Sequence, residues 1–106
     1  MTISSAALQP GATLTGSLSA IVTAAGTGRT VITQAVFANP TGAAVSLQVT
    51  VTRSGGSSLV IVPTRSIATL ATDIPDELAV FSMGPGDVIY ALGAGLNVFV
   101  SGYTAT

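Results

Sequence analysis

The sequence predicts an all-β protein: a single small β-sandwich of about eight short antiparallel strands, with jelly-roll-like connections. Three observations indicate this class. Runs of β-branched and apolar residues alternate with turns rich in Gly, Pro and Asn along the chain. Strong helix formers such as Lys and Glu are scarce. The length of 106 residues suits one compact domain with its own core.

The clearest strand covers residues 45–52. Val and Leu at its odd positions alternate with Ser, Gln and Thr at its even positions. This alternation predicts one buried face and one solvent-facing side. The run at 30–38 is also β-branched and apolar, and the intervening Asn39-Pro40-Thr41-Gly42 fits a type I turn. We therefore expect residues 30–53 to form a hairpin.

The remaining strands are separated by similar turns. They are expected at Ser19–Ala24, Leu59–Val62, Val88–Leu92 and Leu96–Ser101, with turns at Ala25–Gly28, Ser54–Ser57, Gly84–Asp87 and Gly93–Gly95. Gly84–Asp87 has Pro and then Gly at its centre, as a type II turn prefers, and the Asp87 carboxylate can accept backbone N–H groups of that turn.

Two segments are less regular. Around Pro75–Val80, one turn of helix and a strand over Glu77–Ser82 fit the residues equally well. Residues 1–10, with Ile3 and Leu8 as large apolar anchors, are expected to form an N-terminal arm that docks on an adjacent subunit. Residues 11–106 would then form the sandwich domain.

Charge is nearly absent from the chain. Charged residues make up 7% of it, against roughly 25% in an average soluble domain. The net charge of −1 and three isolated arginines argue against nucleic acid as a partner. Polar residues and glycines interrupt the apolar stretches, so neither a signal peptide nor a membrane-spanning helix is expected. A chain with so little charge is expected either to be covered largely by copies of itself or by partners, or to have an uncharged surface of Thr and Ser.

The composition also removes most catalytic chemistry. With no His, Cys or Lys, the chain has no nucleophile–histidine pair, thiol, ordinary zinc site or Schiff-base lysine. Asp73, Asp76 and Glu77 form an acidic cluster whose carboxylates could belong to a glycosidase pair or to a calcium loop. A solvated turn, paired with an arginine of a neighbouring subunit, fits these residues better. No catalytic, cofactor-binding or metal-binding residue is predicted, and the protein is not expected to be an enzyme.

The aromatic residues could form a platform on which a ligand stacks, or they could belong to the core and to subunit contacts. Core and subunit-contact roles are the more common ones in a small β protein and are favoured here. Phe99 is the exception, because Leu96, Val98 and Val100 would face the core and leave Phe99 pointing outward with Asn97 and Ser101. An outward Phe on a strand suggests a surface for a partner.

The order of these segments resembles that of small β-sandwich structural proteins of tailed bacteriophages, of the kind found as capsid decoration (cement) proteins and in tail or fibre parts. The segments that carry the resemblance are Gly28-Arg29-Thr30-Val31-Ile32, Phe37-Ala38-Asn39, the alternating strand with its Ser-Gly-Gly-Ser loop, Gly86-Asp87-Val88-Ile89 and the Gly-spaced final strand. The likeness spans nearly the whole chain and is loosest over Pro63–Val80.

The resemblance implies a virion protein on the capsid surface that binds the outer capsid and clamps neighbouring major capsid subunits. It would act as a homo-oligomer, most simply a trimer, without cofactor, nucleic acid or membrane. The interface residues expected are Ile3, Leu8, Arg53, Arg65, Phe99 and Tyr103. The alternatives are a phage neck, tail or fibre component, and a carbohydrate-binding or adhesin module; the absence of Trp weighs against the last.

Overall fold

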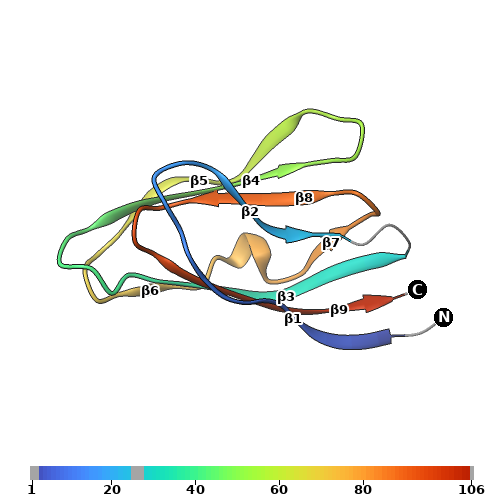
Figure 1. Ribbon diagram of the computed structural model, residues 1–106, viewed down its shortest axis with the longest axis horizontal. Helices are drawn as coiled ribbons and strands as arrows, with labels where there is room; N and C mark the ends of the chain where they lie inside the picture. The colour runs from blue at the N-terminus through green and yellow to red at the C-terminus, as the bar shows by residue number, and fades with distance from the viewer. Residues whose placement is uncertain (1–2, 25–27, 106) are drawn as a thin grey trace.

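The computed structural model describes residues 3–24 and 28–105, which form two antiparallel sheets packed face to face (Figure 1). The elements are β1 (Ile3–Thr13), β2 (Ser19–Thr23), β3 (Arg29–Ala38), β4 (Val45–Thr52), β5 (Ser58–Ile67), β6 (Thr72–Asp73), the 3-10 helix η1 (Asp76–Leu78), β7 (Phe81–Met83), β8 (Val88–Leu92) and β9 (Asn97–Ala105).

The strand order is that of a jelly roll. One sheet, here called the β9 sheet, has the order β1-β9-β3-β6, and β7 also pairs with β3. The other, the β8 sheet, has the order β2-β8-β4-β5. The first strand lies beside the last, the second beside the last but one, and the chain passes repeatedly between the sheets. The predicted fold class is confirmed.

The core lies between the sheets and is almost entirely aliphatic. The predicted inner face of β4 is confirmed, because Leu47, Val49 and Val51 are buried. The outer face of β4 is less exposed to solvent than expected, since Thr50 is only 6% exposed. Thr50 lies in a central strand, directly between Tyr90 of β8 and Val60 of β5, and these larger neighbours cover it.

The hairpin predicted for residues 30–53 is wrong. Both strands exist, but β3 belongs to the β9 sheet and β4 to the β8 sheet, so the connection between them crosses from one layer to the other. No type I turn organises it. Instead, the Thr41 backbone N–H donates to Asn39 Oδ1 at 3.0 Å. An Asn-Pro-x-Gly turn reverses the chain equally well within a sheet or between two sheets.

Asn39 ties this connection to the rest of the fold. Its side chain is 1% exposed, and its Nδ2 donates to the backbone oxygens of Ala43, Ile67 and Ala68 at 2.9, 2.9 and 3.2 Å. Its backbone N–H donates to Ala71 O, also at 2.9 Å. One side chain thus satisfies carbonyls from two connections that are far apart in the sequence.

Residues 3–10, expected as an arm, are part of the sandwich instead. They form most of edge strand β1, whose first residues pair with the end of β9, from Ile3 opposite Ala105 to Ala7 opposite Ser101. The boundary expected between residues 10 and 11 falls inside this strand. Leu8 is partly buried and packs against the core. Its side chain lies directly over Gly102, where any larger residue would clash, because a Cβ on Gly102 would lie 2.8 Å from Leu8 Cδ1. Close packing over a glycine therefore holds β1 in place.

The segment around Pro75–Val80 contains both predicted alternatives, the helical turn and the strand, in shortened form. Asp76–Leu78 is a single 3-10 turn, and β7 follows at Phe81–Met83. The next turn matches its prediction, since Gly86 has φ +84° and the Asp87 N–H donates to Gly84 O at 3.2 Å, as in a type II turn. The predicted turn at Ala25–Gly28 lies outside the described residues, apart from Gly28.

Candidate interaction surfaces

Asp87 joins three segments at one end of the β8 sheet. It is 5% exposed, and its Oδ2 lies 2.7 Å from Arg53 Nη1. The backbone N–H groups of Ser54 and Gly84 donate to its carboxylate at 2.8 and 2.9 Å. These contacts hold the pKa of the Asp87 carboxyl below its ordinary value, first through the Ser54 N–H and then through the Arg53 guanidinium. Asp87 therefore has the structural role that the sequence predicted.

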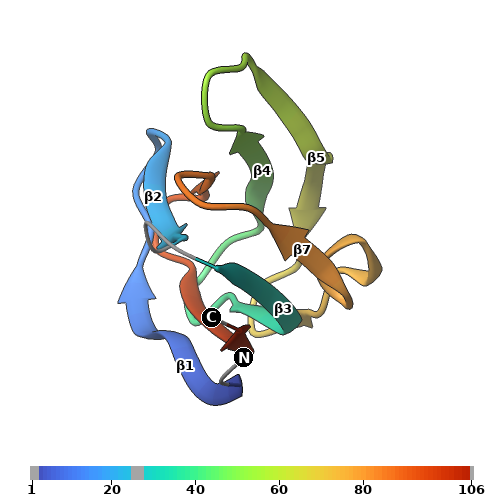
Figure 2. The same cartoon turned by 90° about the vertical axis from the view of Figure 1, so that its right-hand side faces the viewer.

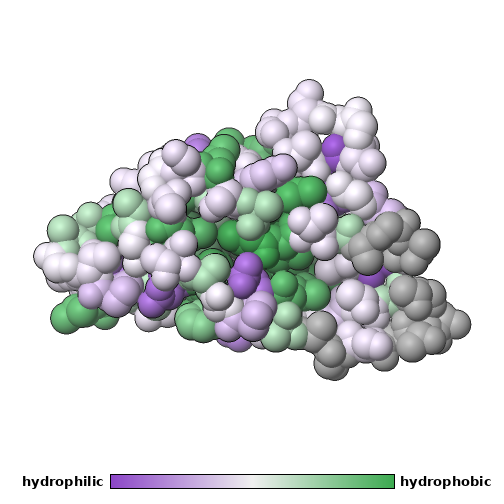
Figure 3. All heavy atoms as spheres, viewed as in Figure 1, coloured by the Kyte–Doolittle hydropathy of each residue, from purple (hydrophilic) through white to green (hydrophobic). Residues whose placement is uncertain are grey.

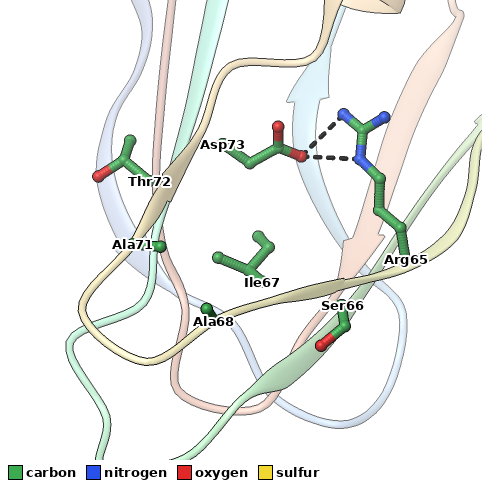
Figure 4. A pocket seen from close by; sticks show the side chains of 7 residues that line it. All are labelled: Arg65, Ser66, Ile67, Ala68, Ala71, Thr72 and Asp73. Carbon is green, nitrogen blue, oxygen red and sulfur yellow. Dashed lines mark hydrogen bonds and ion pairs between the residues drawn. The ribbon is translucent and has the colours of Figure 1, made fainter.

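Arg53 and Arg65 both form ion pairs within their own chain. Arg53 also donates to Ser82 O at 3.1 Å and lies 5.1 Å from the centroid of the Phe81 ring. Arg65 binds Asp73 at 2.7 Å and approaches Glu77 at 3.5 Å. The arginine expected from a neighbouring subunit for the acidic cluster is thus supplied by the chain itself, as Figure 4 shows for Arg65 and Asp73.

A small pocket of about 190 Å³ lies beside this ion pair, between the end of β5 and β6 (Figure 4). Ile67, Ala68 and Ala71 supply its apolar lining. In the described ranges, no three side chains of the metal-ligating types come together. No described helix is long and apolar enough to cross a bilayer.

The aromatic residues do not form a shared platform. Tyr90 lies on β8 and Tyr103 on β9, in different sheets. Phe37 is fully buried, and Phe81 lies beneath Arg53. Phe99 is 45% exposed between the buried Val98 and Val100, so the prediction of its outward direction is confirmed.

Large apolar side chains are exposed at several places on the described surface. They are Leu18, Leu59, Val60, Leu70, Ile74, Val80 and Phe99. Figure 3 shows that one face is mainly pale or green, with few strongly hydrophilic residues. Exposed apolar side chains on a nearly uncharged surface favour contacts with other protein chains.

Leu70 combines exposure with an unfavourable backbone conformation. It is 81% exposed and has φ +61°, in a turn closed by the Ala71 N–H donating to Ala68 O. An L-residue in this region costs about 1–2 kcal/mol. The Leu70 N–H donates to Asn39 O at 2.9 Å, so the buried connection next to it holds the turn in shape. Strain of this kind marks candidate functional positions.

Replacing Leu70 by glycine is expected to raise the free energy of unfolding by about 0.5–1 kcal/mol, because glycine adopts a positive φ without a Cβ clash. Val80→Gly is the matched control, since Val80 is equally exposed and has no positive φ. The control variant should lose about 0.5–1 kcal/mol. Urea denaturation measures both, and a loss in Leu70→Gly would contradict the strain.

The six residues expected at an interface are spread over the fold. Phe99 is exposed on the β9 sheet, and Tyr103 is half-buried on the same strand. Leu8 is half-buried against its own core, and the Ile3 side chain lies outside the described part of the structure. Arg53 and Arg65 are partly exposed and paired. Leu70, Ile74 and Val80 were missed, because exposure of an aliphatic residue in an irregular segment has no local sequence signal.

The fold is similar to that of chains from larger assemblies. A chain of the T13 particle of infectious bursal disease virus matches with a TM-score of 0.56 and 11% identity, over 97% of this chain and 30% of the viral chain. A chain of the Gt strain of that virus gives the same values. A chain of the Bacillus endospore appendages, which are disulfide-linked pili, matches with a TM-score of 0.51 and 16% identity, over 97% of this chain and 85% of the pilus chain.

These matches extend over nearly all of this chain, which spans less than a third of the viral chain's length. At such low identities they establish the fold class. No protein-family model and no curated protein sequence matches the chain.

Proposed function

We propose that this protein is a non-enzymatic structural protein of a virion, and specifically a capsid decoration protein. It binds the outer surface of the capsid, stabilises contacts between neighbouring major capsid subunits and forms a homo-oligomer. Each copy would add buried apolar area, worth roughly 25 cal/mol per Å², across a seam that recurs over the shell.

The observation that carries this proposal is the contrast between charge and apolar exposure. Most of the few charged side chains are occupied in ion pairs within the described residues. Large aliphatic side chains, by contrast, remain exposed, Leu70 and Val80 at 81% each. Such a surface suits burial among other chains better than turnover of a substrate. The jelly-roll fold, which is common among viral capsid proteins, is consistent with this role.

Counting copies by quantitative mass spectrometry of purified particles tests the proposal. Hundreds of copies per particle are expected for a decoration protein. A dozen or fewer would contradict decoration and favour a neck or tail position. Complete absence from particles would contradict a virion role altogether. Sedimentation equilibrium of the purified protein tests the oligomer, for which three copies is the prediction.

A fibre or tail component is the second candidate. The similarity to a pilus chain favours it, because this chain covers 85% of that chain and so corresponds to most of a fibre-forming unit. This chain contains no cysteine, so contacts between its copies would have to be non-covalent in place of the disulfide links of those pili. Electron microscopy of purified protein at high concentration separates the two, since fibres are expected only for the second candidate.

A further inference from the structure

Two opposite charges have no charged partner among the described residues. Arg53 pairs with Asp87, and Arg65 serves both Asp73 and Glu77. Arg29 and Asp76 remain, and both residues are exposed. Arg29 Nη1 donates to the Ser82 hydroxyl at 3.0 Å, a neutral partner that leaves its charge uncompensated.

Arg29 and Asp76 lie along the same side of the sandwich. Figure 2 shows β1 and β2 at one side and β5 and β7 at the other, where the segment from β6 to β7 closes the gap between the sheets. We call this side the β7 flank and define it by Arg29, Ile74, Asp76, Val80 and Ser82. All five residues are exposed, Ile74 at 51% and Val80 at 81%.

The strand register gives the order of these residues along the flank. Asp73 pairs with Phe37, whereas Met83 pairs with Thr30, so the segment between them runs along β3 towards Arg29. The seven residue steps from Thr30 to Phe37 span about 23 Å. Ile74 and Asp76 therefore lie towards one end, Val80 lies between, and Ser82 with Arg29 lies at the other end.

We infer that the β7 flank is a contact between two copies of this chain, in which Arg29 of each copy pairs with Asp76 of the other. The inference rests on the proposed structural function and names a partner surface for it. Along the flank, Asp76 gives a negative end, Val80 an apolar middle and Arg29 a positive end. A second copy of the flank that runs antiparallel to the first therefore offers the complementary charge at each end. An antiparallel pair of flanks forms two ion pairs around Val80, and a partner of one dominant charge would satisfy only one end.

The contact is expected to be weak in solution. The flank, about 23 Å long on a molecule that measures 28 Å across its two sheets, offers roughly 600 Å² per copy, which is below the roughly 800 Å² per partner of a standard stable interface. Because both copies use the same surface, the contact joins two copies and no more. The two copies can be separate monomers or members of neighbouring oligomers. Its strength in an assembly comes from repetition.

Charge reversal tests the pairing by sedimentation equilibrium at protein concentrations up to about 1 mM. Arg29→Asp and Asp76→Arg should each weaken association about tenfold or more, because like charges then face each other. The double variant should associate within about threefold of the original protein, because both ion pairs re-form with reversed sign. Restored association cannot come from stability losses, which would add in the double variant.

Two apolar variants provide the matched control. Val80→Ser should weaken association, whereas Leu18→Ser should not, since Leu18 is 47% exposed on the loop between β1 and β2, away from the flank. Circular dichroism and thermal melting establish that each variant is folded. A protein that stays monomeric, single reversals without effect, or a double variant as weak as the single ones would each overturn the inference.

This experiment and the copy count fail independently. Hundreds of copies in particles together with harmless charge reversals would reject the flank contact and leave the decoration role intact. A pair that behaves as described, in a protein absent from every particle, would reject the virion role and keep the contact.

Discussion

Asn39→Ala is expected to lower the free energy of unfolding by about 3–4 kcal/mol, the largest loss of any single substitution considered. The substitution leaves the buried backbone oxygen of Ile67 and the partly buried oxygen of Ala68 without their donor and removes the acceptor of the Thr41 N–H. Such a loss is a large part of the 5–15 kcal/mol that stabilises a typical domain. Chemical denaturation followed by circular dichroism measures it.

Two further variants test whether the loss comes from the hydrogen bonds of the Asn39 side chain. Asn39→Asp preserves the shape but places a carboxylate against carbonyl oxygens, so its loss at neutral pH should be at least as large. Asn97→Ala is the matched control, because the Asn97 side chain accepts only one exposed hydrogen bond, from Thr13 at 2.9 Å. Its loss should be below about 1 kcal/mol. Similar small losses at both asparagines would refute the role assigned to Asn39.

Asp87→Ala is expected to lower the free energy of unfolding by about 2–3 kcal/mol. The backbone N–H groups of Ser54 and Gly84 lose their acceptor, and Arg53 loses its partner. Because the Arg53 side chain is 44% exposed, water takes over part of its solvation, and the loss stays below that of a fully buried pair. Glu77→Ala, which removes a 3.5 Å contact at the surface, should cost less than about 1 kcal/mol.

The contribution of Asp87 also depends on pH. Its pKa is lower in the folded protein than the ordinary value of 3.8, so the unfolded chain takes up the proton first as the pH falls. The stabilisation is therefore complete above about pH 5 and declines below about pH 4. Denaturation of the original protein and Asp87→Ala across this range should give curves that converge in acid. Curves that stay parallel down to about pH 2 would contradict the lowered pKa.

Much of the β structure follows from local pattern alone. Alternation at Val45–Thr52 and the apolar run at Val88–Leu92 gave strands with the bounds that the structure has, because period-two burial is a local property. The outward Phe99 followed from the same periodicity. The turn at Gly84–Asp87 followed from the conformational preferences of Pro and Gly.

The failures concern what each segment meets in space. The connection after β3 has the same turn residues whether it closes a hairpin or crosses between layers, and only the buried Asn39 contacts decide between these. Residues 3–10 resemble a free arm in the sequence, because their local pattern does not indicate that they pair with the distant strand β9. The ion-pair partner of Arg53 likewise could not be predicted from local sequence, since Arg53 and Asp87 are far apart in the chain.

Composition and periodicity alone determined that this chain forms strands, contains no His, Cys or Lys and carries very little charge. Those properties depend on the identity and spacing of neighbouring residues, which the chain states directly. The tertiary structure decided which strands pair, which charges neutralise each other and which apolar side chains remain exposed. These outcomes depend on contacts between distant segments, whose energies arise only when both sheets have closed over a common core.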